Sequence, residues 1–453
     1  MTSETEAVLD IAVVGSGISG MSAAWLLSQR HRVTVYESDD RLGGHSQTVD
    51  APAGPGSLAV DMGFIVYNET NYPNLTALFA HLGVPTKPTQ MTFSVSLDDG
   101  ALEYAPNTPF SLFAQPRNLL SGRFWTMLGD ILKFYRHAPT HACALDGRAT
   151  TLGEYLDANG YGGEFQDDHL LPQAAAIWSA PTHCIREFPA EAFIRFCETH
   201  GLLKVFGRPV WRTVEGGSRA YVERLTARYA DRVQLGCGVR QIKRAGDGVL
   251  VTDQRGGVRR FDHVVVAAHA DQALAMLSDP SEDERRLLGA FGYVRNHAVL
   301  HTDSSLMPRR RAAWSGWNYL GRPGERGGRD LCVTYWMNQL QRLPRTHPLF
   351  VTLNPIHAPR ADSLIRTEIY EHPVFDAAAI AAQPGLWSLQ GRRNTWYCGA
   401  YFGAGFHEDG LQAGLAVAEA LGGVRRPWRV KDESGRINIA GAPAPAPALE
   451  VAA

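Results

Sequence analysis

Apolar and polar positions near the start of the chain predict a βαβ unit. Residues 8–14, VLDIAVV, form a short apolar run rich in β-branched side chains, which is typical of a buried strand. An apolar stripe through residues 18–30 predicts a helix, and the run RVTVYE at 32–37 predicts a second strand. Two strands joined by a helix in this way should lie parallel, with a right-handed connection.

The middle of the chain has a different pattern. Amphipathic spacing predicts helices at 109–138, 151–160 and 187–203. Alternating runs broken by glycine and aspartate turns predict strands within 232–270, and strands of a second sheet at 297–303 and 331–340. The helical block therefore looks separate from the strands on either side of it. The alanine- and proline-rich residues 440–453 predict a disordered segment.

Length and composition narrow the class of protein. The 453 residues fit two or three domains, and 45% hydrophobic residues are enough for a large core. A net charge of −2 provides no basic field, so we expect no nucleic-acid partner. Six scattered cysteines show neither C-x-x-C pairs nor metal-ligand spacing, which predicts reduced thiols and no metal site. The chain shows no signal-peptide pattern and no run of 18 apolar residues, so we expect a cytoplasmic protein.

The loop after the first strand carries the main chemical signal. In the stretch AVVGSGISGM, Gly15 allows a tight turn, Gly17 lets backbone N–H groups approach a phosphate, and Gly20 lets helix and strand pack closely. The N-terminus of the following helix offers further N–H groups and a partial positive charge. Glu37 ends the second strand, 22 residues after Gly15, where a carboxylate can accept from ribose hydroxyls. Together these features predict a dinucleotide site.

The next stretch distinguishes FAD from NAD. In ESDDRLGGHSQTV, Arg41, Gly43 and Gly44 resemble the R-x-G-G motif of the amine oxidase superfamily of flavoproteins. That superfamily includes monoamine and polyamine oxidases, phytoene desaturases and protoporphyrinogen oxidases. VDMGFIVYN at 60–68 and TWYCGAYFGAGFHEDGLQAGLAVAEAL at 395–421 are similar to two further motifs of the superfamily. No second G-x-G-x-x-G loop exists for a separate NAD domain.

The resemblance implies a fold and a cofactor site. The fold is α/β: a three-layer, Rossmann-like FAD-binding domain with an inserted substrate domain of mixed sheet plus helices, of the amine oxidase and phytoene desaturase type. The FAD-binding domain would comprise 1–90, 209–285 and 388–430, the substrate domain 91–208 and 286–387, and a flexible tail 431–453. The residues implied to contact FAD are Gly15, Ser16, Gly17, Ile18, Ser19, Gly20, Glu37, Ser38, Arg41, Gly43, Gly44, His45, Gly63, Phe64, Val239, Ala267, Ala268, Gly399, His407, Glu408, Asp409, Gly410 and Leu411.

The sequence departs from the amine oxidases in two ways. Many of them hold a water at the flavin with a lysine, but the similar stretch here has Arg295 and Asn296, and no lysine occurs between residues 243 and 431. Cys398 lacks the context of the cysteine that binds flavin covalently, so we expect non-covalent FAD. The sequence identifies no obligate acid or base. The weak catalytic candidates are His45, Tyr67, Tyr335 and Phe406, and Trp336 and Tyr401 are further candidates for the substrate-facing wall.

A narrower resemblance concerns the substrate. RLGGHSQTV, DMGFIVYN, HPVFD and GFHEDG are similar to a bacterial subgroup of NAD/FAD-binding proteins, related to the flavoprotein domain of plant cyclopropane fatty acid synthases. This implies a fatty acyl lipid that is dehydrogenated by hydride transfer to flavin N5. The alternatives are a flavin-containing amine oxidase acting on a small molecule and a flavin-binding accessory partner of a lipid methyltransferase.

Two segments could contact a membrane. Residues 109–138 combine aromatic and aliphatic side chains with four basic ones, and could lie on a bilayer or equally form a helical roof over the flavin site. Residues 308–317, PRRRAAWSGW, could lie at phospholipid head groups or form an ordinary loop. The expected location is therefore cytoplasmic, with peripheral membrane contact as an open alternative.

Overall fold

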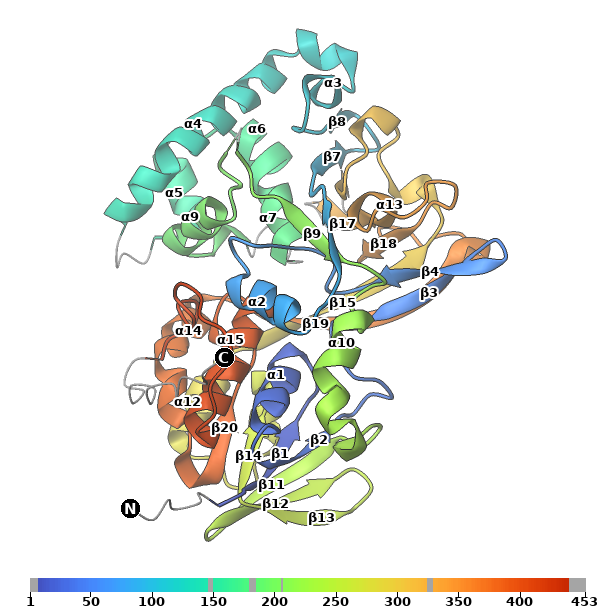
Figure 1. Cartoon of the computed structure of the whole chain (residues 1–453). Helices are drawn as coiled ribbons and strands as arrows, with labels where there is room; N and C mark the ends of the chain where they lie inside the picture. The colour runs from blue at the N-terminus through green and yellow to red at the C-terminus, as the bar shows by residue number, and fades with distance from the viewer. Residues whose placement is uncertain (1–6, 146–149, 179–184, 205–206, 324–328, 440–453) are drawn as a thin grey trace.

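The computed structural model of the chain describes residues 7–145, 150–178, 185–204, 207–323 and 329–439. Two lobes are visible in Figure 1, and each contains its own sheet. Two large clusters of buried apolar side chains correspond to these lobes.

A parallel sheet in the order β10-β2-β1-β14-β20 forms the centre of the first lobe. Its strands are β1 (Asp10–Val14), β2 (Arg32–Tyr36), β10 (Val233–Gln234), β14 (His263–Val266) and β20 (Thr395–Tyr397). The apolar run of β1 is buried because β1 lies between β2 and β14, with which it pairs in parallel. The predicted βαβ unit is therefore confirmed.

Helices and a second sheet sandwich the parallel sheet. On one side α1 (Ile18–Leu27) packs along α15 (His407–Gly422), and a Cβ atom at Gly414 would stand 2.2 Å from the carbonyl oxygen of Ser19, so only glycine permits this approach. On the other side β11 (Val239–Ala245), β12 (Gly248–Asp253) and β13 (Val258–Phe261) form an antiparallel sheet that contacts β1 and β14. The expected three-layer α/β architecture is thus confirmed.

The second lobe is built on a seven-stranded mixed sheet in the order β19-β15-β18-β17-β16-β7-β8. Only β16 and β7 pair in parallel; the other neighbours are antiparallel. The strands are β7 (Phe93–Leu97), β8 (Leu102–Tyr104), β15 (Gly292–His301), β16 (Trp317–Pro323), β17 (Arg329–Trp336), β18 (Phe350–Leu353) and β19 (Leu364–Val374). The predicted strands at 297–303 and 331–340 both belong to this sheet, although the second ends at Trp336, where α13 (Met337–Leu340) begins.

Helices gather beside this sheet, and α4 lies along the outer edge of the molecule (Figure 1). They are α3 (Pro109–Leu112), the 3-10 helix η1 (Pro116–Leu120), α4 (Gly122–Ala144), α5 (Leu152–Ala158), α6 (Gly163–Phe165), α7 (Leu171–Trp178) and α9 (Ala190–Thr199). The helices predicted within 109–138 are therefore present as three pieces, and Pro116 stands at the start of the second because proline is tolerated in the first turn of a helix.

Shorter elements connect the lobes. The hairpin of β3 (Thr48–Ala53) and β4 (Gly56–Asp61) and the small sheet β5-β9-β6 lie between the two main sheets in Figure 1. The remaining elements are β5 (Tyr67–Asn68), β6 (Thr86–Thr89), β9 (Trp211–Val214), α2 (Pro73–His81), α10 (Arg219–Thr226), α11 (Ala270–Met276), α12 (Glu282–Leu288) and α14 (Ala377–Ala382).

Two of the predicted boundaries differ from the packing. Phe375 and the apolar side chains of α14 belong to the first cluster, although residues 286–387 were assigned to the substrate domain. The predicted start of the flexible tail, residue 431, is too early. Ile437 is buried, and Arg436 Nε donates to Asp409 at 2.6 Å, so these residues are packed against the first lobe. The rest of the predicted tail, 440–453, lies outside the described residues.

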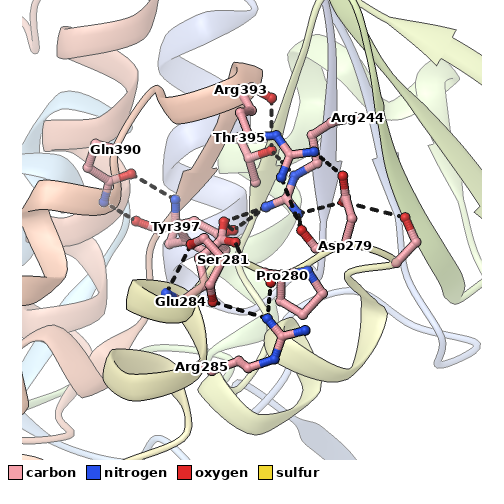
Figure 2. A network of polar contacts seen from close by, with 11 residues as sticks. Arg244, Asp279, Pro280, Ser281, Glu284, Arg285, Gln390, Arg393, Thr395 and Tyr397 are labelled. Atoms are coloured by element: carbon pink, nitrogen blue, oxygen red, sulfur yellow. Dashed lines mark hydrogen bonds and ion pairs between the residues drawn. The ribbon is translucent and has the colours of Figure 1, made fainter.

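A buried polar network fastens the three-stranded sheet and α12 to the edge strand β20 (Figure 2). The guanidinium of Arg244 on β11 donates to Thr395 Oγ1 at 3.1 Å, to Asp279 Oδ1 at 3.0 Å and to the carboxylate of Glu284. The hydroxyl of Tyr397 on β20 donates to Glu284 at 2.6 Å. Because the Arg244 and Glu284 side chains are almost fully buried, each charge depends on the other.

Candidate functional site

The glycine-rich loop leaves the N-terminus of α1 open. The Gly15 N–H donates to the carbonyl of Tyr36 at 2.8 Å, and its φ of +95° is a conformation that glycine adopts without strain. A Cβ at Gly20 would stand 2.0 Å from the Gly15 oxygen, whereas a Cβ at Gly17 would meet no described atom within 4 Å. No described side chain caps α1, and its first turn holds no acid. The first N–H groups of α1 are therefore free to bind a phosphate, as the sequence predicted.

Glu37 lies beside this loop at the end of β2. Its Oε2 accepts from the Ser16 N–H at 2.8 Å, and its Oε1 accepts from the Ser38 hydroxyl at 3.1 Å. The Cys237 N–H donates to the Glu37 carbonyl at 2.7 Å, which places the start of β11, and with it Val239, next to the same strand end. The residues assigned to the ribose and the adenine are thus neighbours, and Glu37 also fixes the loop that precedes α1.

The R-x-G-G motif packs directly against the glycine loop. A Cβ at Gly44 would stand 3.1 Å from the Gly17 Cα, and Gly44 has a φ of +54°. The Gly43 N–H donates to the Ser16 carbonyl at 3.1 Å, and Arg41 Nη1 donates to the Gly44 carbonyl at 2.8 Å. Glycines in both motifs therefore let two backbones approach each other, and Arg41 places positive charge nearby.

The ends of three parallel strands complete this edge. A Cβ at Gly15 would stand 2.9 Å from the Ala267 oxygen, and the Cys398 N–H donates to the Val266 carbonyl at 3.1 Å. The turns that carry Ala267, Ala268 and Gly399 thus follow β14 and β20 at the carboxyl edge of the sheet. This edge is where ligands bind in open α/β sheets.

The N-terminus of α15 meets the other motifs through His407. The Phe64 N–H donates to the His45 carbonyl at 2.8 Å, and the Phe64 ring stacks on His407 with centroids 3.9 Å apart. His407 Nε2 lies 2.8 Å from the hydroxyl of Tyr221, a residue that the sequence reasoning missed. Burial lowers the pKa of His407 to about 3, so the imidazole is neutral at pH 7. A Cβ at Gly63 would stand 2.1 Å from the His45 oxygen, so this approach also requires glycine.

The side chains of Glu408 and Asp409 do not face the predicted cofactor site, which corrects their assignment as cofactor contacts. Glu408 Oε1 accepts from the Asn74 N–H and Oε2 from the Leu75 N–H, both at 3.0 Å, so this carboxylate caps α2. Asp409 accepts from the Phe406 N–H at 2.7 Å and pairs with Arg436. Carboxylates are favoured at helix N-termini, and both are used there by the protein itself.

Gly410 instead brings the first turns of α15 and α1 together. A Cβ at Gly410 would stand 2.7 Å from Ser19 Oγ and 2.9 Å from Ile18 Cγ2. Leu411 is fully buried in the first cluster. These residues therefore hold the two helix N-termini side by side.

Neutral histidines gather beside His45. Its ring centroid lies 5.3 Å from that of His372 and 4.9 Å from that of Tyr370, and its Nε2 is buried without a hydrogen-bond partner among the described residues. Burial, and then the neighbouring His372, lower the pKa of His45 well below its usual value. Burial also lowers the pKa of His372 to about 4. Both imidazoles are therefore neutral at pH 7. No local sequence pattern marks His372 or Tyr370 as neighbours of His45, because more than 320 residues separate them from it along the chain.

Asn296 belongs to the same cluster. It lies on β15, the strand on which the resemblance to amine oxidases implies a lysine. Asn296 Nδ2 lies 2.9 Å from His372 Nδ1, and Asn296 Oδ1 accepts from Asn354 Nδ2 at 2.7 Å. Arg295 points the other way, since side chains alternate along β15: its side chain is 67% exposed and lies 3.7 Å from Glu371. The side chain that β15 contributes to the cluster is therefore the neutral amide of Asn296.

The aromatic candidates do not form one wall. Tyr67 packs on Phe79 in the first cluster, and Tyr335 packs on Trp317 in the second. Phe406 precedes α15 and stacks on Phe196, with centroids 5.1 Å apart. Trp336 contacts Trp314, and Tyr401 contacts Phe291. Of the four weak catalytic candidates, only His45 lies in the histidine cluster.

The described residues fit FAD. The uncapped N-terminus of α1 can bind the diphosphate, and the carboxylate of Glu37 lies where it can accept from a ribose hydroxyl. The buried Nε2 of His45 has no hydrogen-bond partner among the described residues, so a bound cofactor could supply one. The described part of the chain contains no cluster of three metal-ligating side chains and no helix that could cross a membrane. The five described cysteines are free thiols, and Cys184 lies outside the described residues.

The fold and the site are those of a flavoprotein, and the residues at the carboxyl edge of the Rossmann-like sheet are the ones that would hold FAD. The comparison with protein families agrees: residues 18–372 match the family of flavin containing amine oxidoreductases, and the chain belongs to that family. The members of that family are flavin-containing oxidoreductases.

The individual proteins that resemble this chain share less than a third of its residues in the aligned regions. AofH of Mycobacterium tuberculosis (strain ATCC 25618 / H37Rv), named as a flavin-containing monoamine oxidase, is 27% identical over 285 residues, which cover 60% of this chain and 59% of that protein. The CLA-producing fatty acid isomerase from P. acnes has a TM-score of 0.62 at 17% identity, covering 90% of this chain and 97% of that one. Cyclohexylamine oxidase from Brevibacterium oxydans IH-35A has a TM-score of 0.61 at 18% identity, covering 92% and 100%. The two structures share the fold.

Proposed function

We propose that the chain dehydrogenates a carbon–carbon bond of an apolar, fatty acyl substrate. The observation that carries this proposal is the neutral cluster of His45, His372 and Asn296. Asn296 lies on the strand where the sequence resemblance implies the lysine of many amine oxidases. Bound FAD supplies the hydride acceptor. The residues of the chain supply an uncharged surface, which suits an apolar substrate better than a cationic amine.

His45 is the residue best placed to handle a proton. Forming a double bond removes a hydride from one carbon and a proton from its neighbour, so the proton needs an acceptor. The His45 Nε2 atom is buried, has no hydrogen-bond partner among the described residues and belongs to a neutral imidazole, which can accept a proton in the tautomer that leaves Nε2 bare. His372 and Asn296 would then orient the ring of His45.

Amine oxidation is the second candidate. The names of AofH and of cyclohexylamine oxidase favour it, and so does the family to which the chain belongs. The absence of a lysine between residues 243 and 431 argues against it. The fatty acid isomerase shows that the same fold is also found in a protein named for a fatty acid.

Anaerobic flavin reduction distinguishes the two candidates. The FAD-loaded chain is mixed with unsaturated fatty acids, with phospholipids in detergent and with primary amines, and loss of the oxidised flavin absorbance is followed. We expect bleaching by an acyl compound and none by amines, and we expect His45→Asn to slow bleaching about a hundredfold. His297→Asn, a change of an exposed histidine on β15 next to Asn296, serves as the control.

Two other outcomes would contradict the proposal and support a different function. Bleaching by amines alone would establish the second candidate. Tight FAD binding with no bleaching by any compound, together with a lipid methyltransferase that co-purifies with the chain, would make the protein an accessory subunit instead.

A further inference from the structure

The outer edge of the helical block carries an apolar surface. Five of the eleven exposed large hydrophobic side chains among the described residues lie between residues 110 and 132. They are Phe110, Leu119, Leu120, Trp125 and Leu132, which we call the apolar tip. Leu120 is 92% exposed and Phe110 is 77% exposed, although such side chains are usually buried. Exposed apolar side chains gathered on one part of a folded protein mark an interaction surface.

The apolar tip belongs to folded elements. Trp125 Nε1 donates to the carbonyl of Leu119 at 2.9 Å, which ties the first turn of α4 to η1. The ring of Phe113, at the end of α3, lies 5.8 Å from the ring of Trp125. Leu132 follows Trp125 by two turns of α4 and extends the tip along the same face of the helix. In Figure 1 α3 and the start of α4 lie at the end of the molecule farthest from the parallel sheet.

Basic side chains are more frequent than acidic ones in the segment that carries the apolar tip. Residues 109–144 contain four basic side chains, those of Arg117, Arg123, Lys133 and Arg136, and one acidic side chain, that of Asp130. The segment thus has a net charge of +3 (4 − 1), whereas the whole chain has −2. Arg123 is already paired with Asp168 at 2.7 Å, so the other three supply most of the attraction for an anion. All three are exposed.

A cleft adjoins the tip. It has a volume of about 550 Å³ and lies between η1, the start of α4 and the β7–β8 hairpin. Leu120, Phe124 and Met127 provide apolar lining. The polar lining comes from Arg117, Asn118, Ser121, Arg123, Asp98 and Asp168, of which Arg123 and Asp168 pair with each other. Polar and apolar surfaces side by side match the head group and the upper acyl chain of a phospholipid. The 308–317 segment contains none of the exposed large apolar side chains, and its Arg310 pairs with the buried Glu103.

We propose that the apolar tip is a docking surface for a bilayer that contains anionic phospholipid. Leu120 and Phe110 enter the apolar layer, while Arg117, Lys133 and Arg136 lie among the head groups. A protein partner would need its own complementary apolar patch, whereas a bilayer supplies apolar depth and negative charge together. This proposal does not depend on the proposed function, because binding to a bilayer requires no turnover.

Vesicle flotation tests the proposal. The full FAD-loaded chain is mixed with vesicles of phosphatidylcholine alone or of phosphatidylcholine with phosphatidylglycerol. We expect it to float with the mixed vesicles and to be released by salt. Leu120→Ser and Phe110→Ser should each weaken binding about tenfold, and Arg117→Gln about fivefold. Leu364→Ser, which changes an exposed leucine on β19, is the matched control and should bind as the wild type does.

The readouts separate this proposal from misfolding and from the flavin chemistry. FAD content and thermal unfolding should be the same in every variant, since the changed side chains are exposed. Failure of the wild type to float with the mixed vesicles would overturn the proposal, as would equal loss of binding in Leu364→Ser. Light scattering that shows a dimer which Leu120→Ser dissociates would also overturn it, because a second copy would then be the occupant.

Discussion

Changing Gly17 to alanine should weaken FAD binding while leaving the fold intact. Gly17 has an ordinary φ of −64°, and a Cβ there would meet no described atom within 4 Å, so alanine fits without strain. Gly17 is the N-cap of α1, where alanine in place of glycine costs about 0.5–1 kcal/mol of stability. The open space at Gly17 is where a phosphate would approach, and the added methyl group would fill it.

The size of the binding effect follows from the hydrogen bonds at risk. A hydrogen bond to a charged group contributes about 1.5–3 kcal/mol, so loss of one phosphate contact should raise the dissociation constant for FAD about 10- to 150-fold. Fluorescence titration of the apoprotein with FAD measures this constant, and urea unfolding measures stability. Gly414→Ala gives the opposite pattern, because its Cβ would stand 2.2 Å from the Ser19 oxygen and should cost about 1–3 kcal/mol of stability. Wild-type affinity in Gly17→Ala would refute the reasoning.

Three further predictions follow from the contacts. Arg244→Met should lower the free energy of unfolding by about 3–5 kcal/mol, since it leaves the buried carboxylate of Glu284 without its cation. The exposed Arg286→Met should change it by under about 1 kcal/mol, and urea titration compares the two variants. Glu408→Gln should cost about 1–3 kcal/mol in the same assay with an unchanged FAD dissociation constant, whereas weaker FAD binding at equal stability would restore Glu408 to the cofactor site. The pKa of His372 falls from 6.5 in the unfolded chain to about 4 in the fold, so the unfolded state binds more protons in this window and stability should fall as pH drops from 6.5 to 4. His372→Asn should make that dependence shallower, while the other buried histidines keep their share, and an unchanged slope would contradict the assignment.

The sequence predicted the parts of the site that depend on glycine spacing and on strand order. Gly15, Gly20 and Gly44 are separated along the chain, but each is required by a close backbone approach, and such requirements leave a recognisable pattern. The βαβ unit was also predictable, because its apolar runs are buried on both faces.

Other parts of the site depend on tertiary contacts that no local pattern encodes. The sequence placed Glu408 and Asp409 correctly at a helix start, but only the packing of α2 and of residues 431–439 shows that their carboxylates have protein partners. The contact between His45 and His372 joins residues from different lobes. The assignment of residues 375–387 to the substrate domain was based on order along the chain, whereas their apolar side chains pack in the first cluster.

The central claim is that this chain holds FAD without a covalent bond, with the diphosphate at the start of α1. The most direct measurement is the visible absorbance of the purified, undenatured chain, followed by acid precipitation and identification of the released molecule. The account predicts one FAD per chain, released intact into the supernatant. A colourless protein that takes up no added FAD, or a flavin that stays with the precipitate, would contradict it.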